Sequence, residues 1–347
     1  MREDHDVVVL GRQWPTVEAR LPAVRALAAT LPSSGVTGQI SAGLVDSWNQ
    51  WDGVGLVIAN AVFVAFILRH AVLLAGLVNS LVKGLLARGE DVYIIDWGYP
   101  DRSDKYLTLE DYIERFIGGA VDYLRKAHKQ DAINLLGICQ GGVFSLCYAA
   151  LHPRKVRNLI TMVTPVDFHT EGNMLANWTR GMDVDLMVDT LGNVPADMMN
   201  FTYLQLKPWR LFVQKYVGLV DILDNKQALE DFLRMEKWIF DSPDQAGEAF
   251  RQFIKQFYQR NGFIKGGIEI GGEAVDLGFV DMPVLNIYAE QDHLVPPDAS
   301  RALRGRIGSS DYTESSFRGG HIGIYVSGRA QREVPGTITD WLKERSA

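Results

Sequence analysis

The sequence predicts an α/β protein with a mainly parallel sheet that is interrupted by a long helical insertion. Short β-branched segments alternate with helical segments between residues 91 and 166, and the alternation resumes at residue 283. The intervening residues 167–280 are rich in tryptophan, methionine and phenylalanine and carry few strand signals. Strands that alternate with helices form parallel sheets whose crossover helices cover both faces. We therefore expect one sheet built from two separated parts of the chain, with the insertion forming a cap.

The composition is typical of a packed globular protein. Of 347 residues, 47% are hydrophobic and 22% are charged, which excludes a largely disordered chain and a coiled coil. The formal net charge of −7 argues against a nucleic-acid surface, because phosphate binding needs clustered lysine and arginine. The two cysteines, Cys139 and Cys147, are too few for a disulfide framework. We expect the chain to work in a reducing cytoplasm.

The first part of the chain has the weakest pattern. Residues 1–53 lack the basic and apolar regions of a secretory signal, so such a signal is not expected. Because prolines break this segment into short pieces, we expect irregular structure or loosely attached helix there. Residues 54–78 form the most apolar run, which Arg69 and His70 interrupt. A central arginine costs about 2.5–3.5 kcal/mol in a membrane-spanning helix. We favour a buried helix or a pair of central strands, and keep a membrane span as the alternative.

Regular elements follow from residue 81. Residues 91–96 form a β-branched strand, and Thr108 can cap a helix whose apolar positions recur at helical spacing. Residues 133–138 predict a second strand, residues 143–151 a helix and residues 156–163 a third strand. Two further strands are expected at 283–288 and 312–317. The chain thus divides into an atypical N-terminal segment, a core and a cap, at residues 1–72, 73–166 with 281–347, and 167–280.

The turn after the second strand carries a candidate nucleophile. Gly137-Ile138-Cys139-Gln140-Gly141 has the form G-x-S-x-G, with cysteine in the place of serine. The motif requires a strand before it and a helix after it, and both are predicted here. The N-terminus of that helix would favour a thiolate. The plainer alternative is a small buried cysteine beside an ordinary glycine turn, which is our expectation for Cys147.

An acid and a histidine follow in the order that such a nucleophile needs. Asp292 comes after the strand at 283–288, and His321 after the strand at 312–317. Side chains just past the carboxyl ends of parallel strands gather at one edge of the sheet. We therefore predict that Cys139, His321 and Asp292 form a catalytic triad. The alternatives are that Asp292 is only a turn or helix-capping carboxylate and that His321 is a solvated loop histidine. His293 either supports this site or is a partly exposed neighbour.

A metal site is not expected. Asp167 and His169 are close in sequence, but no third ligand stands at a useful spacing.

Six stretches between about Leu81 and the end carry a family resemblance. They are KGLLARGEDVYIIDWGYPD, NLLGICQGG, TMVTPVDF, RMEKWIFDSPDQAGE, LNIYAEQDHLVPPDASRAL and GGHIGIYVSG. This part of the chain resembles the catalytic subunit of class III polyhydroxyalkanoate synthases. The resemblance implies an α/β-hydrolase core with a cap, in which Cys139 is the nucleophile, Asp292 the acid and His321 the base.

The resemblance also implies an activity and partners. Such enzymes polymerise (R)-3-hydroxyacyl-CoA thioesters and release coenzyme A through a cysteine-bound acyl intermediate, without a cofactor. We expect 3-hydroxybutyryl-CoA as the monomer. A second, non-catalytic subunit, the surface of a polymer granule and a dimeric or hetero-oligomeric state are implied as well.

The N-terminal part departs from the family at the loop that should complete the site. The backbone N–H of Gln140 is expected to be one oxyanion donor. The family reads like Val-Asn-Arg-Pro-Tyr in the loop that should supply the second, but here Val78-Asn79 runs directly into Ser80-Leu81. Val78 and Asn79 are therefore the candidates, and a lost donor costs about 10²–10³ in rate. A catalytically impaired scaffold at a granule or membrane surface, and a thioesterase, remain as alternatives.

Overall fold

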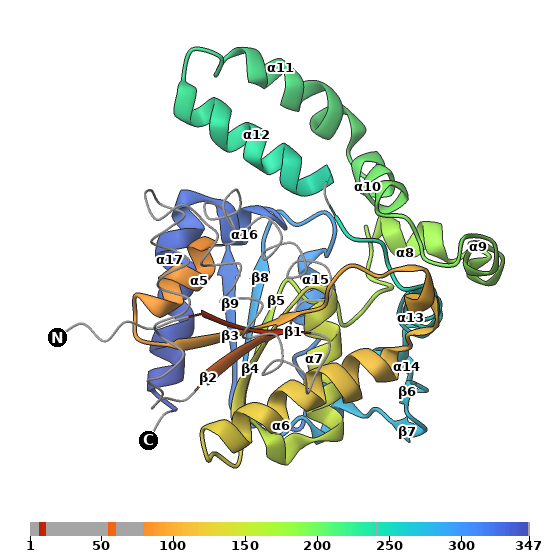
Figure 1. The fold of residues 1–347 in the computed structure, drawn as a ribbon, viewed down its shortest axis with the longest axis vertical. Coiled ribbons are helices and arrows are strands. Elements are labelled where there is room, and N and C mark those ends of the chain that lie inside the picture. The colour runs from red at the N-terminus through yellow and green to blue at the C-terminus, as the bar shows by residue number, and fades with distance from the viewer. Residues whose placement is uncertain (1–6, 12–54, 60–78, 241, 346–347) are drawn as a thin grey trace, which may run out of the picture.

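A single parallel sheet organises the molecule. The computed structural model describes residues 7–11, 55–59, 79–240 and 242–345. Within them, seven strands pair in the order β1-β3-β2-β4-β5-β8-β9, and every neighbouring pair is parallel (Figure 1). The strands are β1 (Val7–Gly11), β2 (Gly55–Ala59), β3 (Asp91–Asp96), β4 (Ile133–Ile138), β5 (Val156–Met162), β8 (Val284–Ala289) and β9 (Tyr312–Phe317). All carboxyl ends therefore lie at the same edge.

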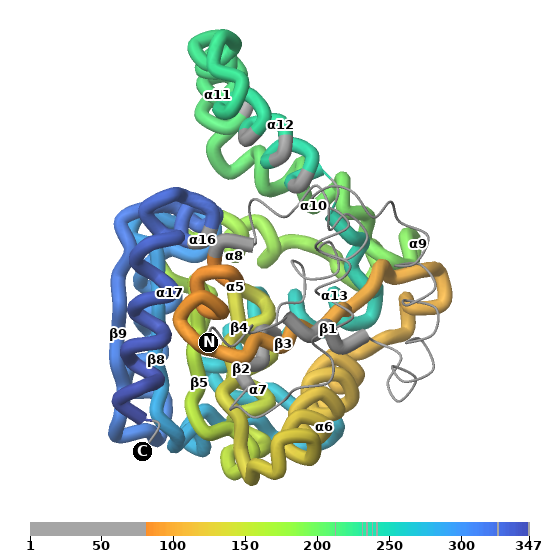
Figure 2. Tube along the Cα trace, turned by 60° about the vertical axis from the view of Figure 1, so that its left-hand side comes forward, coloured from red at the N-terminus to blue at the C-terminus, as the bar shows by residue number. Residues whose placement is uncertain are grey.

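Helices cover both faces of the sheet. Helices α5 (Asn79–Leu86) and α17 (Gly328–Lys343) pack together on one side, and α6 (Gly118–Ala127) and α7 (Gln140–Leu151) lie on the other (Figures 1 and 2). A Cβ on Gly84 of α5 would lie 2.4 Å from Cγ of Pro335 in α17, so a glycine is what lets the two helices approach this closely. Strands β4, β5 and β8 are buried along almost their whole length, as the central strands of a parallel sheet generally are.

Most of the predicted core elements are confirmed. The strands at 91–96, 133–138 and 312–317 have the expected bounds. Thr108 caps as predicted, because its Oγ1 accepts the Asp111 N–H at 3.2 Å while the Asp111 carboxylate accepts the Thr108 N–H at 2.9 Å. The first turns behind it form the π-helix η3 (Asp111–Ile117), which leads into α6. The helix predicted at 143–151 begins earlier, at Gln140, because the turn at Cys139 leads directly into it.

The expectation for the N-terminal segment was wrong where the structure describes it. Residues 7–11 form strand β1 instead of irregular structure or loose helix. Their sequence Val-Val-Val-Leu-Gly begins with three β-branched valines and carries no polar side chain, which suits a parallel strand.

For the apolar run, the central-strand alternative is confirmed at residues 55–59. These residues form β2, which pairs with both β3 and β4. Residues 54 and 60–78, including Arg69 and His70, lie outside the described residues. In the described ranges, no helix has the length and apolar character to cross a bilayer.

The insertion between β5 and β8 is helical apart from one short hairpin. Its antiparallel strands β6 (Glu269–Ile270) and β7 (Glu273–Ala274) lie in the glycine-rich stretch. The helical elements are α8 (Met174–Thr179), α9 (Val184–Leu191), α10 (Ala196–Gln205), η5 (Trp209–Gln214), α11 (Lys215–Val220), α12 (Lys226–Phe240), α13 (Gly247–Phe253), η6 (Ile254–Gln259) and α14 (Gly262–Lys265).

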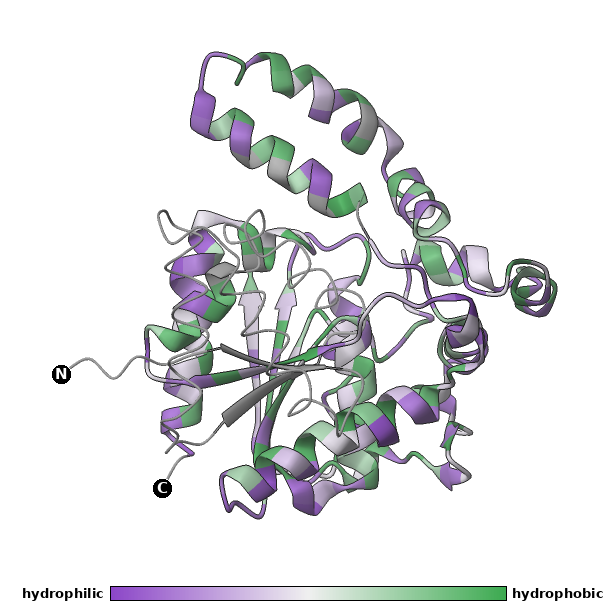
Figure 3. Ribbon diagram, viewed as in Figure 1, coloured by the Kyte–Doolittle hydropathy of each residue, from purple (hydrophilic) through white to green (hydrophobic). Residues whose placement is uncertain are grey.

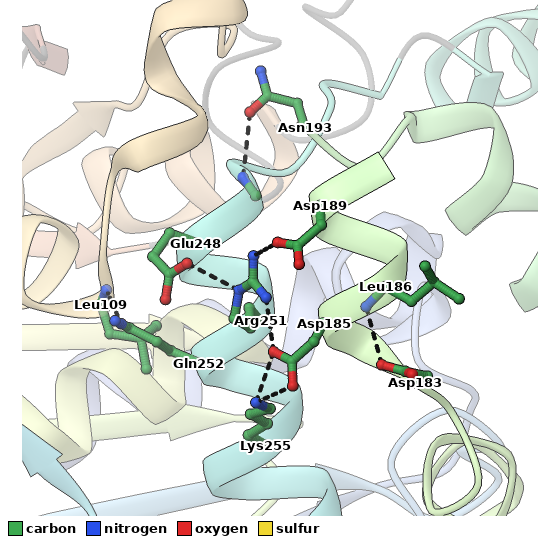
Figure 4. A network of polar contacts seen from close by, with 11 residues as sticks. Leu109, Asp183, Asp185, Leu186, Asp189, Asn193, Glu248, Arg251, Gln252 and Lys255 are labelled. Carbon is green, nitrogen blue, oxygen red and sulfur yellow. Dashed lines mark hydrogen bonds and ion pairs between the residues drawn. The ribbon is translucent and has the colours of Figure 1, made fainter. Parts of the chain in front are cut away.

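An ion-pair network ties the base of this insertion together. The guanidinium of Arg251 on α13 reaches Asp185 at 2.7 Å and Asp189 at 2.6 Å, both on α9, and Glu248 at 2.9 Å (Figure 4). The Leu109 N–H donates to Oε1 of Gln252 at 2.8 Å, which links α13 to the segment before η3.

Beyond this base the chain extends as a distal arm, residues 196–240, which comprises α10, η5, α11 and α12. The arm leaves and re-enters through a narrow neck, where Val194 and Gln245 exchange two backbone hydrogen bonds of 2.9 Å. The Asp244 carboxylate accepts the Ala196 N–H at 2.9 Å beside them. The arm projects from the body as a helical hairpin that carries mixed apolar and polar surface (Figures 1 and 3).

Candidate active site

Cys139 sits in a strained turn at the carboxyl end of β4. Its backbone has φ 53° and ψ −119°, a conformation that non-glycine residues adopt rarely and that is concentrated at functional sites. The Cys139 N–H donates to the Met162 carbonyl on β5 at 2.9 Å, and the Cys139 carbonyl accepts the Gly142 and Val143 N–H groups. The turn is therefore held from both sides. Cys139 is partly exposed, whereas Cys147 is fully buried in the core, as predicted.

Two glycines make this turn possible. A Cβ on Gly137 would lie 2.5 Å from Oγ of Ser145 and 2.6 Å from the carbonyl of Gly141. A Cβ on Gly142 would lie 1.8 Å from Oγ1 of Thr164, which is 1% exposed. Since side chains at these positions would collide with buried groups, the first glycine of the motif and the glycine that follows the motif are packing requirements of the turn.

Asp292 and His321 meet at the same edge of the sheet. Asp292 follows β8 and His321 follows β9. Nδ1 of His321 lies 2.7 Å from Oδ2 of Asp292, and the two side chains are 5% and 1% exposed. The other carboxylate oxygen of Asp292 accepts the N–H groups of Leu294 and Val295, both at 2.9 Å. These backbone donors fix the carboxylate, and the carboxylate in turn fixes the orientation of the imidazole.

The electrostatics couple His321 to both partners. Burial by itself lowers the pKa of His321, but the charges of Asp292 and Cys139, with hydrogen bonds to each, outweigh it and raise the pKa to about 10. An imidazolium held beside a carboxylate can store a proton and stabilise negative charge that develops on a nearby sulfur. The structure thus pairs His321 directly with Asp292 and places Cys139 close enough for its charge to act on His321. The triad itself stays a prediction.

His293 lies in the electrostatic field of this pair. Burial lowers its pKa, positive charge on Lys207, His321 and Arg210 lowers it further, and Asp292 opposes the shift. His293 is therefore neutral at pH 7. Its supporting role stays a prediction.

Two tyrosines near Cys139 were missed in the sequence. Tyr203 belongs to α10 of the distal arm and Tyr258 to η6. Burial, followed by the negative charge of Cys139, raises the pKa of Tyr203, and the pKa of Tyr258 is raised by burial, Tyr203 and Cys139. Both phenols therefore stay protonated and can donate hydrogen bonds near the sulfur. The aromatic richness of the insertion was the available signal, but it did not single out these two.

The oxyanion candidates are only partly described. Gln140 is the first residue of α7, and N–H groups in the first turn of a helix have no partner within the helix. Asn79 is the first residue of α5, and Val78 lies outside the described residues. Gln140 also borders a small, partly open cavity of about 20 Å³ with Asp244 and Gln245 of the neck, a volume that suits one water molecule.

Asp167 and His169, which were not expected to bind a metal, form hydrogen bonds with their neighbours. Oδ1 of Asp167 accepts the His169 N–H at 2.9 Å and the Asn261 amide at 2.8 Å. Nε2 of His169 donates to the Tyr258 carbonyl at 2.8 Å. These bonds hold the loop after β5 against the segment that carries Tyr258. Across the described residues, no cluster of three His, Cys, Asp or Glu side chains suited to a metal was found.

The fold has many relatives of known structure. A sequence model described as alpha/beta hydrolase fold matches residues 65–327. The putative non-heme bromoperoxidase BpoC of Mycobacterium tuberculosis superposes with a TM-score of 0.51 at 12% identity, over 86% of this chain and 95% of that one. A thermophilic esterase from Thermogutta terrifontis gives 0.50 at 14% identity, over 85% and 92%. At such identities the likeness concerns the fold alone.

Sequence comparison is more specific. The chain is 65% identical over 267 residues to the poly(3-hydroxyalkanoate) polymerase subunit PhaC of Allochromatium vinosum, covering 77% of this chain and 75% of that protein. It is 54% identical over 274 residues to the protein of the same name from Synechocystis, covering 77% and 72%. The elbow cysteine with its buried aspartate–histidine pair thus stands on a chain that belongs to the poly(3-hydroxyalkanoate) polymerase family within the alpha/beta-hydrolase fold.

Proposed function

We propose that this chain is the catalytic subunit of a polyhydroxyalkanoate synthase, which polymerises (R)-3-hydroxyacyl-CoA with release of coenzyme A. The observation that carries the proposal is the buried His321–Asp292 pair, 2.7 Å apart, whose imidazole is coupled to a strained cysteine at the head of α7. The relatives' name as poly(3-hydroxyalkanoate) polymerase subunits supports the substrate class. The proposed chemistry uses side chains of the protein and needs no cofactor.

The first step transfers the acyl group to Cys139. Its sulfur, with the thiol proton held on His321, attacks the thioester carbonyl carbon, and the bond from that carbon to the coenzyme A sulfur breaks. Coenzyme A leaves as a thiol with the proton from His321. Because one thioester replaces another, little free energy separates substrate from acyl-enzyme, and Asp292 stabilises the imidazolium in between.

The second step forms the polymer's ester bond. The 3-hydroxyl of a second acyl group attacks the carbonyl carbon on Cys139, His321 takes the hydroxyl proton, and the sulfur leaves as a thiolate paired with imidazolium. The negative oxygen of each tetrahedral intermediate needs N–H donors. We assign the Gln140 N–H to this role and keep Val78 and Asn79 as candidates for the second donor.

The proposal extends to partners and location. A class III second subunit would assemble with this chain in the cytoplasm, where both would associate with the polymer granule as a dimer or hetero-oligomer. 3-Hydroxybutyryl-CoA is the first monomer to test.

Mass spectrometry after incubation with 3-hydroxybutyryl-CoA tests the proposal. We expect an acyl adduct on Cys139, with polymer and free coenzyme A as products. Cys139→Ala should abolish both adduct and polymer, since it removes the nucleophile. Cys147→Ala is the matched control and should keep most activity, because Cys147 is buried in α7.

Other outcomes would refute specific parts of the proposal. An adduct on Cys147 would overturn the nucleophile. Free hydroxy acid in place of polymer would make the protein a thioesterase, and a complete lack of coenzyme A release would leave only a scaffold.

A further inference from the structure

We propose that Lys207 and Arg210, at the start of η5 on the distal arm, form the subsite that binds the phosphate groups of the coenzyme A thioester. The inference rests on the proposed function, because it takes the substrate class from there. It adds a recognition site outside the catalytic residues.

The two cations lie on one face of a helical turn. The Leu211 N–H donates to the Lys207 carbonyl at 2.9 Å, so residues 207–211 form one continuous turn. Side chains three positions apart in such a turn are neighbours on its surface. Lys207 and Arg210 can therefore contact the same multiply charged group.

Both side chains are available to a ligand. Lys207 and Arg210 are exposed, and within the described ranges neither forms an ion pair. Two other cations of the insertion are already engaged, because Lys215 pairs with Glu236 and Arg251 with three carboxylates. Lys207 and Arg210 therefore make this part of the surface locally positive, in a chain whose formal net charge is −7.

The position of the pair matches the layout of the substrate. Lys207 and Arg210 lie close enough to His293 for their charge to act on it, and His293 adjoins Asp292 of the catalytic pair. Tyr203, four residues before Lys207, lies near Cys139. The segment therefore runs from the reacting sulfur to an exposed cationic surface, just as a coenzyme A thioester runs from its thioester to its phosphates.

Charge is the physical basis of recognition here. Phosphate oxygens form strong hydrogen bonds with guanidinium and ammonium groups. In an acidic protein, a local positive surface also raises the concentration of an anionic substrate near the site. Because exposed charges are screened over about 8–10 Å at ordinary salt, the attraction should weaken as ionic strength rises.

Calorimetric binding of free coenzyme A and of pantetheine, which lacks the nucleotide and its phosphates, tests the subsite on the full-length protein. Lys207→Gln with Arg210→Gln should weaken coenzyme A binding about tenfold and flatten its salt dependence. Pantetheine binding should not change. Lys226→Gln removes one positive charge from an exposed residue at the start of α12, and should leave both affinities as they are.

The results separate this subsite from the proposed function. Unchanged coenzyme A binding in the double variant, an equal loss in Lys226→Gln, or no coenzyme A binding by the wild type would overturn the subsite. Acylation of Cys139 is read separately by mass spectrometry. If coenzyme A binding depends on the two cations but no acyl adduct forms, the catalytic proposal fails while the binding site stands.

Discussion

Two helices of the molecule, α7 in the body and α11 in the distal arm, differ sharply in their surroundings. All residues from Gly141 to Ala150 of α7 are buried, whereas α11 has no buried residue and exposes Val217 and Val220 at 62% and 66%. Elements with few buried contacts open more easily than the core. The body therefore holds its side chains in fixed positions, whereas the arm exposes most of its side chains to solvent.

The division suits the two tasks of the proposed enzyme. Attack on a carbonyl needs its groups placed within a fraction of an ångström, which the glycine-dependent elbow and the buried His321–Asp292 pair provide. Binding of a phosphate-bearing group by exposed cations acts over several ångströms and tolerates movement. A change in the body should therefore alter chemistry or folding, and a change at the exposed cations of the arm should alter substrate affinity.

Asp292→Asn is expected to have the largest effect. An asparagine can hold the wrong imidazole tautomer and cannot stabilise imidazolium, so acylation should slow about 10³–10⁴-fold. Single-turnover coenzyme A release measures this rate. A loss below tenfold, no larger than the change in coenzyme A affinity expected from the arm variants, would contradict the comparison. A greater loss in polymer formation than in acylation would indicate that Asp292 also serves the hydroxyl attack.

The same variant should change the titration of His321. Burial favours its neutral form and the anionic partners favour the charged form, so the pKa should fall most in Asp292→Asn and less in Cys139→Ala. Histidine NMR measures it. Since the folded pKa is raised to about 10, protonated His321 stabilises the fold fully below the unfolded value of about 6.5, and this contribution is lost as pH rises through about 10. A stability advantage over His321→Gln that grows above neutral pH would refute the sign.

Glycine substitutions compare the packing of the two regions directly. Gly142→Ala forces a Cβ to 1.8 Å from the buried Thr164 hydroxyl and should cost about 1–3 kcal/mol of unfolding free energy. Gly218→Ala in α11 meets nothing within 4 Å and should gain about 0.5–1 kcal/mol, because alanine restricts the unfolded chain and favours helix. Urea unfolding measures both. Similar costs at the two sites would show that the arm is packed like the body.

The sequence predicted what depends on local pattern. β3, β4 and β9 are short segments bounded by turn residues, and β3 and β4 are also mainly apolar. Cys139 lies in a motif that requires the strand and the helix found around it. Asp292 and His321 could be placed because the carboxyl ends of parallel strands converge. Chain order and strand ends were sufficient to predict that Asp292 and His321 meet at this edge, while the catalytic roles of the three residues stay a prediction.

What depends on tertiary folding was not predicted. Tyr203 and Tyr258 come from different helices 55 positions apart in the sequence, and only the return of the arm to the body brings both near Cys139. β1 was missed because it is only five residues long and is followed by a proline-broken segment. The sequence alone does not show which strand it would pair with. The helix boundary at Gln140 was misplaced because the backbone strain at Cys139, and not residue preference, sets it.

The smallest expected effect concerns the base that joins the two regions. Arg251→Gln removes the cation shared by Asp185, Asp189 and Glu248. Amide exchange in α9 should quicken about threefold, because the remaining carboxylates repel one another. Arg115→Gln is the matched control, since Arg115 is 64% exposed and, among the described residues, pairs with Asp111 alone, within its own helical segment.

If the geometry of the site is set within the body, Arg251→Gln should leave single-turnover acylation of Cys139 unchanged, although amide exchange in α9 becomes faster. The reason is that the elbow and the His321–Asp292 pair are bonded within the body, through Met162, Leu294 and Val295. Acylation that slows in proportion to the exchange in α9 would mean that the base of the insertion also sets the geometry of the site. The base would then contribute to catalysis as well as joining the insertion to the body.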